Sequence, residues 1–212
     1  MRTTKRTTKV RRVASALLLV AGIVSWIWAV PAWCGEEAFR QSPPRDSWLF
    51  REGRFEVGAM AGGGVSLQHE PRSGTVLALL PRLGYVFYEV EHGVPGSLEI
   101  VAQPGYLVLF QDRTAHVGSL SVLLKYNVRT RTDFTPFLEL GGGGSYSTTR
   151  TGSLGSRFNF SLQAGGGLQY ALSDRHALSF AWIYQHLSNA GMYHANPGLN
   201  AGLFLLGFSM LY

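Results

Sequence analysis

Residues 116–129 read HVGSLSVLLKYNVR and alternate in polarity. Every second position from Leu120 to Val128 is apolar, and the other face carries Ser119, Ser121, Lys125, Asn127 and Arg129. Because successive side chains of a strand point to opposite faces, this stretch predicts a β-strand with one apolar and one polar face. Residues 157–172 repeat the pattern, and little helical periodicity occurs beyond about residue 50.

On both sides of residues 116–129, the body of the chain divides into segments of alternating polarity separated by turn residues. Glycine runs at 62–64, 141–144 and 165–167 lie inside these segments without the Lys-Ser/Thr ending of a phosphate-binding loop, so they indicate close packing or strand bending. Eight segments are predicted, at about 53–68, 74–91, 97–111, 115–129, 133–148, 157–172, 175–189 and 199–212.

A soluble sandwich and a membrane barrel both fit such alternation, and three observations favour the barrel. The strands are long enough for a tilted outer-membrane span. One face is apolar, and the chain ends on a strand whose apolar face runs from Phe204 to the terminal Tyr212. The opposite face carries ionisable residues, which we expect to be paired inside the barrel: Glu56, Arg82, Lys125, Glu139 and Arg157.

The predicted fold is therefore all-β: an eight-stranded antiparallel transmembrane β-barrel of the bacterial outer membrane. An even number of strands closes the sheet without a free edge. A barrel of this size is about filled by its own side chains, so a porin is not expected.

The N-terminus has the features of an export signal. Residues 1–12 are basic, residues 13–30 form an apolar run, and small residues follow at Ala29 and Ala32. We expect a cleaved signal peptide over 1–34, cut between about 32 and 35, although an uncleaved anchor also fits. A periplasmic segment over 35–50 and a barrel domain over 51–212 would follow. Cys34 is the only cysteine, which excludes an internal disulfide.

The charge balance argues against nucleic-acid binding. The formal net charge is +6, but six of the 19 basic residues lie in the first twelve positions, leaving 13 basic and 13 acidic residues. The body is thus neutral and has no phosphate-binding stripe. Histidines are scattered without ligand spacing, so neither a metal nor an organic cofactor is expected.

Polar residues on the apolar parity mark one candidate site. Continuing the outward face of segment 175–189 reaches His186 and then Ser188, and the outward face of segment 199–212 reaches Asn200. A polar group that faces hydrocarbon without a partner costs several kcal/mol, so this cluster needs an explanation. With both termini periplasmic, the hairpin joining these segments is extracellular and the cluster faces the outer leaflet.

The residues fit a serine esterase, with Ser188 as nucleophile and His186 as general base. Two residues apart on one strand face, their Cα atoms would be about 6.5 Å apart, which side chains can bridge. Asn189, or backbone N–H groups of the loop, could stabilise an oxyanion. Alternatively, the polar residues simply mark the headgroup region. Trp182, Tyr184 and Tyr193 fit either an acyl-chain groove or an aromatic girdle.

The run HLSNAGMYHANPGLN at 186–200 resembles the C-terminal signature of the lipid A 3-O-deacylase (PagL-like) family, eight-stranded barrels with a Ser–His–Glu triad on the outer wall. The resemblance implies that His186 is the base and Ser188 the nucleophile, with Asn189 and Asn196 near the oxyanion. It also places the acidic triad member at position 200, which is Asn200 here, and no Asp or Glu follows Asp174.

The function predicted from these observations is hydrolysis of an ester-linked acyl chain of lipid A in lipopolysaccharide, at the 3-position by resemblance. The expected partners are lipopolysaccharide, outer-membrane lipids and, through the strand ending at Tyr212, the barrel-assembly machinery. Because position 200 is Asn, a non-catalytic barrel that binds lipopolysaccharide or a surface partner is the alternative. An acyl-transferring barrel would need an acceptor site that the sequence does not reveal.

Overall fold

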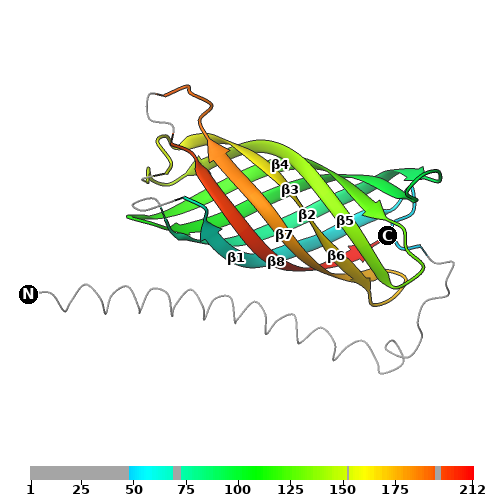
Figure 1. Ribbon diagram of the computed structural model, residues 1–212. Helices are drawn as coiled ribbons and strands as arrows, with labels where there is room; N and C mark the ends of the chain where they lie inside the picture. The colour runs from blue at the N-terminus through cyan, green and yellow to red at the C-terminus, as the bar shows by residue number, and fades with distance from the viewer. Residues whose placement is uncertain (1–47, 69–72, 152, 194–196) are drawn as a thin grey trace, which may run out of the picture. The chain divides into compact units, whose positions relative to one another are not determined.

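The computed structural model describes residues 48–68, 73–151, 153–193 and 197–212. Eight antiparallel strands pair in chain order, and the last strand pairs with the first to close a barrel (Figure 1). The strands are β1 (Phe55–Ser66), β2 (Thr75–Val90), β3 (Gly96–Phe110), β4 (Thr114–Val128), β5 (Phe134–Ser147), β6 (Phe158–Ala171), β7 (His176–Ser188) and β8 (Leu199–Leu211).

Each of the eight segments expected from polarity alternation corresponds to one strand, although β3 and β4 each begin one residue before the predicted segment. The segment predicted at 157–172, for example, holds β6, and the segment predicted at 199–212 holds β8. The predicted all-β, eight-stranded antiparallel barrel is thus confirmed. The signal peptide and most of the periplasmic segment, predicted over 1–34 and 35–50, lie outside the described residues.

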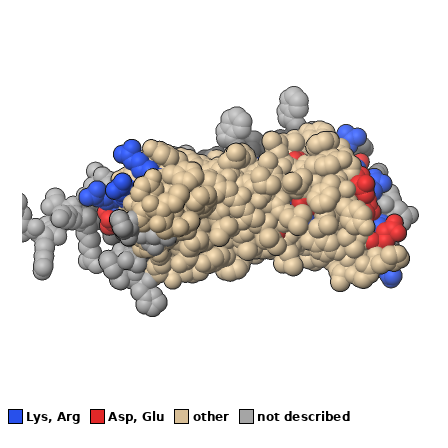
Figure 2. Space-filling model, turned by 90° about the horizontal axis from the view of Figure 1, so that it is seen from above, with Lys and Arg blue, Asp and Glu red and all other residues tan. Residues whose placement is uncertain are grey.

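The outer wall of the barrel is an apolar belt. Charged side chains gather at the two ends, and the band between them is nearly free of charge (Figure 2). Large apolar side chains point outward from this band, such as Leu120, Leu138 and Leu206, which are 60%, 65% and 67% exposed. Such a surface suits lipid rather than water. No helix within the described ranges is long and apolar enough to span a membrane.

The interior is filled by side chains. An apolar cluster that includes Leu109, Leu187 and Leu199 occupies the half of the barrel below the long loops. A second apolar cluster, built around Trp48 and Phe50, closes the other end and packs against Val86, Ala177 and Leu211. This packing is what an eight-stranded barrel allows, and it leaves function to the outer wall or the loops.

Buried charges lie between the two apolar clusters. Arg82 pairs with Glu139 at 2.5 Å, and Lys125 pairs with Glu56 at 2.7 Å and with Glu99 at 3.0 Å. The expectation that inward charges pair with one another is confirmed for these residues.

Arg157 is the exception to that expectation. It precedes β6 and is exposed at the rim of the barrel, because the inward-facing part of the strand begins only beyond it. Its position in the alternating pattern matched the interior, but the strand starts one residue later.

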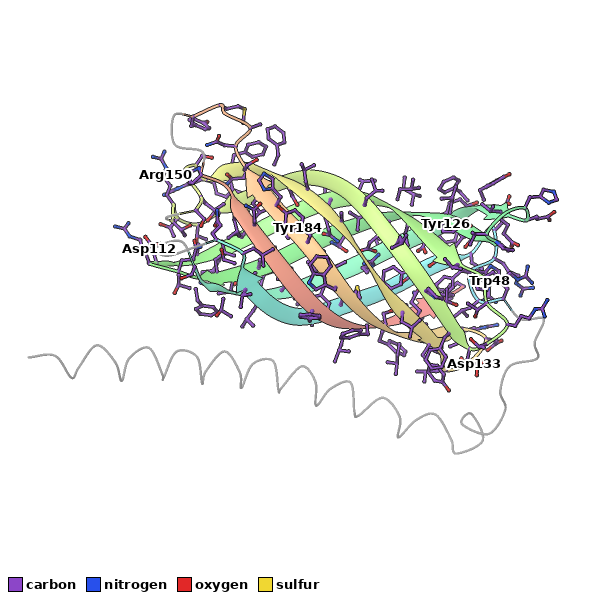
Figure 3. All side chains as sticks on the ribbon, viewed as in Figure 1. Trp48, Asp112, Tyr126, Asp133, Arg150 and Tyr184 are labelled. Carbon is purple, nitrogen blue, oxygen red and sulfur yellow. The ribbon has the colours of Figure 1, made fainter. Side chains whose placement is uncertain are left out.

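The two ends of the barrel differ in their connections. Trp48 and Asp133 lie at the end where the chain finishes, and Asp112 and Arg150 lie at the opposite end (Figure 3). Outer-membrane barrels have short periplasmic turns and longer extracellular loops, which orients this barrel. The periplasmic turns are 91–95, 129–133 and 172–175, and the extracellular connections are 67–74, 111–113, 148–157 and 189–198.

Candidate active site

The candidate site lies on the outward face of β7 and β8 near their extracellular ends. Along β7, Phe180 and Trp182 are exposed on the lipid-facing side, and the same face continues through Tyr184, His186 and Ser188. These last three side chains are half-buried, whereas the alternate positions are buried inside the barrel. The predicted outward position of the polar residues is therefore what the strand alternation produces.

Strand pairing brings Asn200 to His186. The two residues are direct partners in the register of β7 and β8, so their side chains emerge side by side on the same face. His186 Nδ1 and Asn200 Oδ1 are 2.7 Å apart. An amide oxygen only accepts hydrogen bonds, so this contact places the imidazole proton on Nδ1 and leaves a lone pair on Nε2. A neutral histidine in this tautomer can act as a base.

Tyr184 makes a second hydrogen bond to the side chain of Asn200. Its hydroxyl donates a hydrogen bond of 2.7 Å to the same Oδ1 atom that receives His186. From the sequence we expected Tyr184 in an acyl-chain groove or an aromatic girdle, and this contact was not foreseen. The one signal available was its parity, because Tyr184 lies two residues before His186 on the same strand face.

Ser188 is the last residue of β7 and shares the outward face of His186. On its other side it is paired with Phe160 of β6. Residues two apart on a strand have Cα atoms about 6.5 Å apart, so the hydroxyl is within side-chain reach of the imidazole. The structure thus places the predicted nucleophile and base on the same strand face.

Gly198 lies against both of these side chains. A Cβ atom added there would lie 3.2 Å from His186 Cε1 and 3.7 Å from Ser188 Cβ. The φ of Gly198 is +71°, a conformation that favours glycine. The sequence contained a Pro-Gly turn signal at this point, but nothing in it indicated contact with the histidine.

The loop of β1 and β2 holds Gly198 in place. Gln68 Nε2 donates a hydrogen bond of 2.5 Å to the Gly198 carbonyl, and the Leu67 N–H donates one of 2.8 Å to the Asn200 carbonyl. Ser153, from the loop between β5 and β6, donates to Gln68 Oε1 at 2.8 Å. These contacts join segments more than 40 residues apart in the chain, and no local sequence pattern predicts them.

Asn189 shapes the turn that follows Ser188. Its side chain is fully buried, and its Oδ1 accepts a hydrogen bond of 3.0 Å from the Gly191 N–H. The turn contains two residues with positive φ, Ala190 and Gly191. The role of Asn189 at an oxyanion stays a prediction. Asn196, predicted for the same role, lies outside the described residues.

The site holds no carboxylate among the residues that the structure describes. In these residues no Asp or Glu contacts His186, and the side chain that orients it is Asn200. In the same residues, no group of three or more His, Cys, Asp or Glu side chains is arranged to hold a metal ion. The arrangement is an imidazole oriented by an amide, next to a hydroxyl, on a lipid-facing wall.

Comparisons with known proteins place this barrel among outer-membrane proteins. The crystal structure of the outer membrane enzyme PagL is similar, with a TM-score of 0.56 and 24% identity, covering 73% of this chain and 97% of that one. Neisserial surface protein A (NspA) is also similar, with a TM-score of 0.58 and 16% identity, covering 75% and 99%. No curated protein matches the chain.

The family model for lipid A 3-O-deacylase (PagL) matches residues 96–209, which is more than half of the chain and includes β7 and all but the last two residues of β8. The matched range includes His186, Ser188 and Asn200. This chain therefore belongs to the lipid A 3-O-deacylase (PagL) family.

Proposed function

We propose that this protein hydrolyses the ester-linked acyl chain at the 3-position of lipid A, with Ser188 as nucleophile and His186 as general base. The observation that carries the proposal is the hydrogen bond between His186 Nδ1 and Asn200 Oδ1 on the lipid-facing wall. In the neutral imidazole it directs the proton to Nδ1, so that Nε2 can accept a proton on the face that also carries Ser188. Membership in the deacylase family supplies the substrate class.

The reaction would proceed in two halves. His186 Nε2 takes the Ser188 hydroxyl proton as Oγ attacks the ester carbonyl carbon, and the resulting imidazolium gives that proton to the departing sugar oxygen. The acyl chain is then bound to Ser188. In the second half His186 deprotonates a water that attacks the acyl carbonyl and returns the proton to Ser188 Oγ. One water is consumed, and a free fatty acid and a sugar hydroxyl are released.

The position of the site suits a substrate that diffuses in the membrane. Its side chains open onto the apolar belt near the extracellular end, so lipid A would approach laterally from the outer leaflet. At the extracellular end, the charged residues among those described are Arg113, Arg150 and Arg157 with one acid, Asp112. This excess of positive charge favours an anionic lipid at that end of the barrel.

Asn200 sets a limit on the rate. It orients His186 as a carboxylate would, but it carries no charge to stabilise the imidazolium that forms in the transition state. Replacing Asp by Asn in a serine triad lowers the rate by about 10⁴. We therefore expect slow hydrolysis. The same residue favours the second candidate function, a barrel that binds lipopolysaccharide without cleaving it.

The remaining proposals concern export and assembly. We propose a cleaved signal peptide over 1–34, a periplasmic segment over 35–50, and assembly by the barrel-assembly machinery through β8. The outward face of β8 carries Phe204, Leu206 and Phe208, and the terminal Tyr212 is 63% exposed. This apolar last strand supports recognition by that machinery.

The test is mass spectrometry of lipid A before and after incubation with the refolded protein in mixed micelles. Wild type should remove one hydroxyacyl chain, and Ser188→Ala and His186→Ala should each abolish this change while the barrel still folds. His116→Ala is the matched control, because His116 is exposed on the outward face of β4 and has its own hydrogen-bond partner, Tyr106, at 2.6 Å.

The two candidate functions give different results in this assay. Activity retained in Ser188→Ala and His186→Ala would overturn the assignment of the residues. No mass change with folded wild type, combined with saturable lipopolysaccharide binding, would favour the binding barrel.

A further inference from the structure

Two donors meet at one oxygen atom in this site. Asn200 Oδ1 receives His186 Nδ1–H and the Tyr184 hydroxyl, each at 2.7 Å. Tyr184 is paired in register with Gly202, one step below Asn200 on the same face of β8. Asn200 therefore lies diagonally across the strand pair from Tyr184, within reach of an aromatic side chain. The contact follows from the register of β7 against β8.

An asparagine in this position has two possible orientations, unlike a carboxylate. With Oδ1 toward His186, the imidazole carries its proton on Nδ1. With the NH₂ group toward His186, the amide donates to Nδ1 and the proton moves to Nε2. In that second arrangement Nε2 has no lone pair to accept the Ser188 proton. A carboxylate has two equivalent oxygens, so turning it by half a turn changes nothing.

The Tyr184 hydroxyl distinguishes the two amide orientations. In the observed orientation its proton has an acceptor, Asn200 Oδ1. In the reversed orientation the NH₂ group would face Tyr184, and the hydroxyl proton would lose that acceptor on an apolar, lipid-facing wall. Leaving a donor unsatisfied in such surroundings is unfavourable. The tyrosine therefore favours the orientation that leaves His186 Nε2 able to act as a base.

We propose that Tyr184 is a positioning residue that holds the Asn200 amide with its oxygen toward His186 and thereby selects the Nδ1–H tautomer of His186. The kinetic consequence rests on the proposed hydrolase function, whereas the tautomer does not. In this chain the hydroxyl is needed because residue 200 is an amide. It would be dispensable if residue 200 were a carboxylate.

A double-mutant cycle tests this dependence. Tyr184→Phe is made in wild type and in Asn200→Glu, and kcat and KM for deacylation are measured for all four proteins. In the wild-type background kcat should fall roughly tenfold, the worth of one hydrogen bond, with KM unchanged. In the Asn200→Glu background the fall should be below about twofold. Tyr146→Phe, which removes a hydroxyl from an exposed tyrosine on β5, is the matched control.

Equal losses in both backgrounds would overturn the proposal, because they would show that Tyr184 acts on the lipid or on the fold. A rise in KM without a change in kcat would do the same and would indicate an acyl-chain contact. An unchanged kcat in the wild-type background would also overturn it.

A second measurement does not depend on hydrolysis. ¹⁵N NMR of uniformly labelled protein in micelles distinguishes the protonated from the unprotonated imidazole nitrogen, and His186→Ala assigns the signals. Wild type should show Nδ1–H, and Tyr184→Phe should show a mixture or Nε2–H. If wild type and Asn200→Glu both fail to cleave lipid A, the proposed function fails and this measurement alone decides the role of Tyr184. The same His186 tautomer in wild type and in Tyr184→Phe would overturn the proposal.

Discussion

The barrel interior and the outer wall of β7 and β8 both place polar groups away from water, but they do so in opposite ways. Inside, two cations and three carboxylates are buried, and each has an ion partner within 3.0 Å. On the wall, the polar side chains are half-buried, and Tyr184 and His186 are joined by hydrogen bonds to Asn200. Full charges occur where a strand across the barrel can supply the opposite charge.

This contrast separates residues that stabilise the fold from residues that take part in the proposed reaction. The interior charges pair with one another and face no substrate, so their removal should affect folding. The wall residues face the membrane and keep a basic nitrogen beside a hydroxyl, so their removal should affect hydrolysis. Asn200 stands between the two cases, because it contacts His186 where the proposed triad would have a carboxylate, yet its amide carries no charge.

Introducing the missing charge should have the largest effect. Asn200→Glu places a carboxylate beside His186 Nδ1, where it can stabilise the imidazolium, and we expect the deacylation rate to rise by up to about 10⁴. The measurement is the initial rate of fatty-acid release at a fixed lipid A to protein ratio.

Asn200→Gln is the control for that variant, since it adds the same length without charge and should not raise the rate. An unchanged rate in folded Asn200→Glu would mean that the wall cannot use a charge at this position, and the functional distinction between the two regions would fail.

Breaking an interior pair should affect stability instead. Arg82→Met leaves Glu139 buried without its cation, and loss of one partner of a buried pair costs about 3–5 kcal/mol. We expect Arg82→Met to unfold at a lower urea concentration than wild type. Unfolding is measured by the gel mobility of unheated samples. The deacylation rate per folded molecule should stay unchanged.

Two companion variants sharpen this prediction. Arg82→Met combined with Glu139→Leu removes both charges and should recover most of the loss. Arg157→Met removes an exposed rim arginine and should change stability by less than about 1 kcal/mol. A rate that falls with Arg82→Met in the folded fraction would show that the interior contributes to the chemistry.

The sequence was sufficient to predict the barrel because alternation is a local property. Each strand shows its own two faces, and the count of eight and the outward position of His186, Ser188 and Asn200 followed from parity alone. The inward charges were also expected to pair. Which charge meets which depends on strand register across the barrel, and therefore Lys125 with Glu56 and Glu99 could not be foreseen.

The missing parts of the site come from contacts distant in sequence or from unusual backbone conformations. Gln68 lies 130 residues from Gly198, and nothing local to either residue indicates their hydrogen bond. Tyr184 had the right parity, but which residue its hydroxyl reaches depends on the register of β7 against β8. Arg157 was misplaced because parity identifies a face but not the residue at which a strand begins.

Crowding the imidazole should have the smallest effect of the three changes. Gly198→Ala adds a Cβ that would lie 3.2 Å from His186 Cε1, so the histidine or the loop must shift by a few tenths of an ångström. The loop resists such a shift because Gln68 is hydrogen-bonded to the Gly198 carbonyl and Leu67 to the Asn200 carbonyl. We expect kcat to fall roughly ten- to hundredfold, as misplacement of a catalytic group does.

Gly93→Ala separates this crowding from backbone strain. Gly93 lies in a periplasmic turn with φ of +82°, close to the +71° of Gly198, but a Cβ there would meet nothing within 4 Å. Both variants should lose about 1 kcal/mol of stability in urea unfolding, because alanine is strained at positive φ. Only Gly198→Ala should also lose activity. Equal activities of Gly198→Ala and Gly93→Ala would mean that hydrolysis does not depend on the exact position of the His186 imidazole.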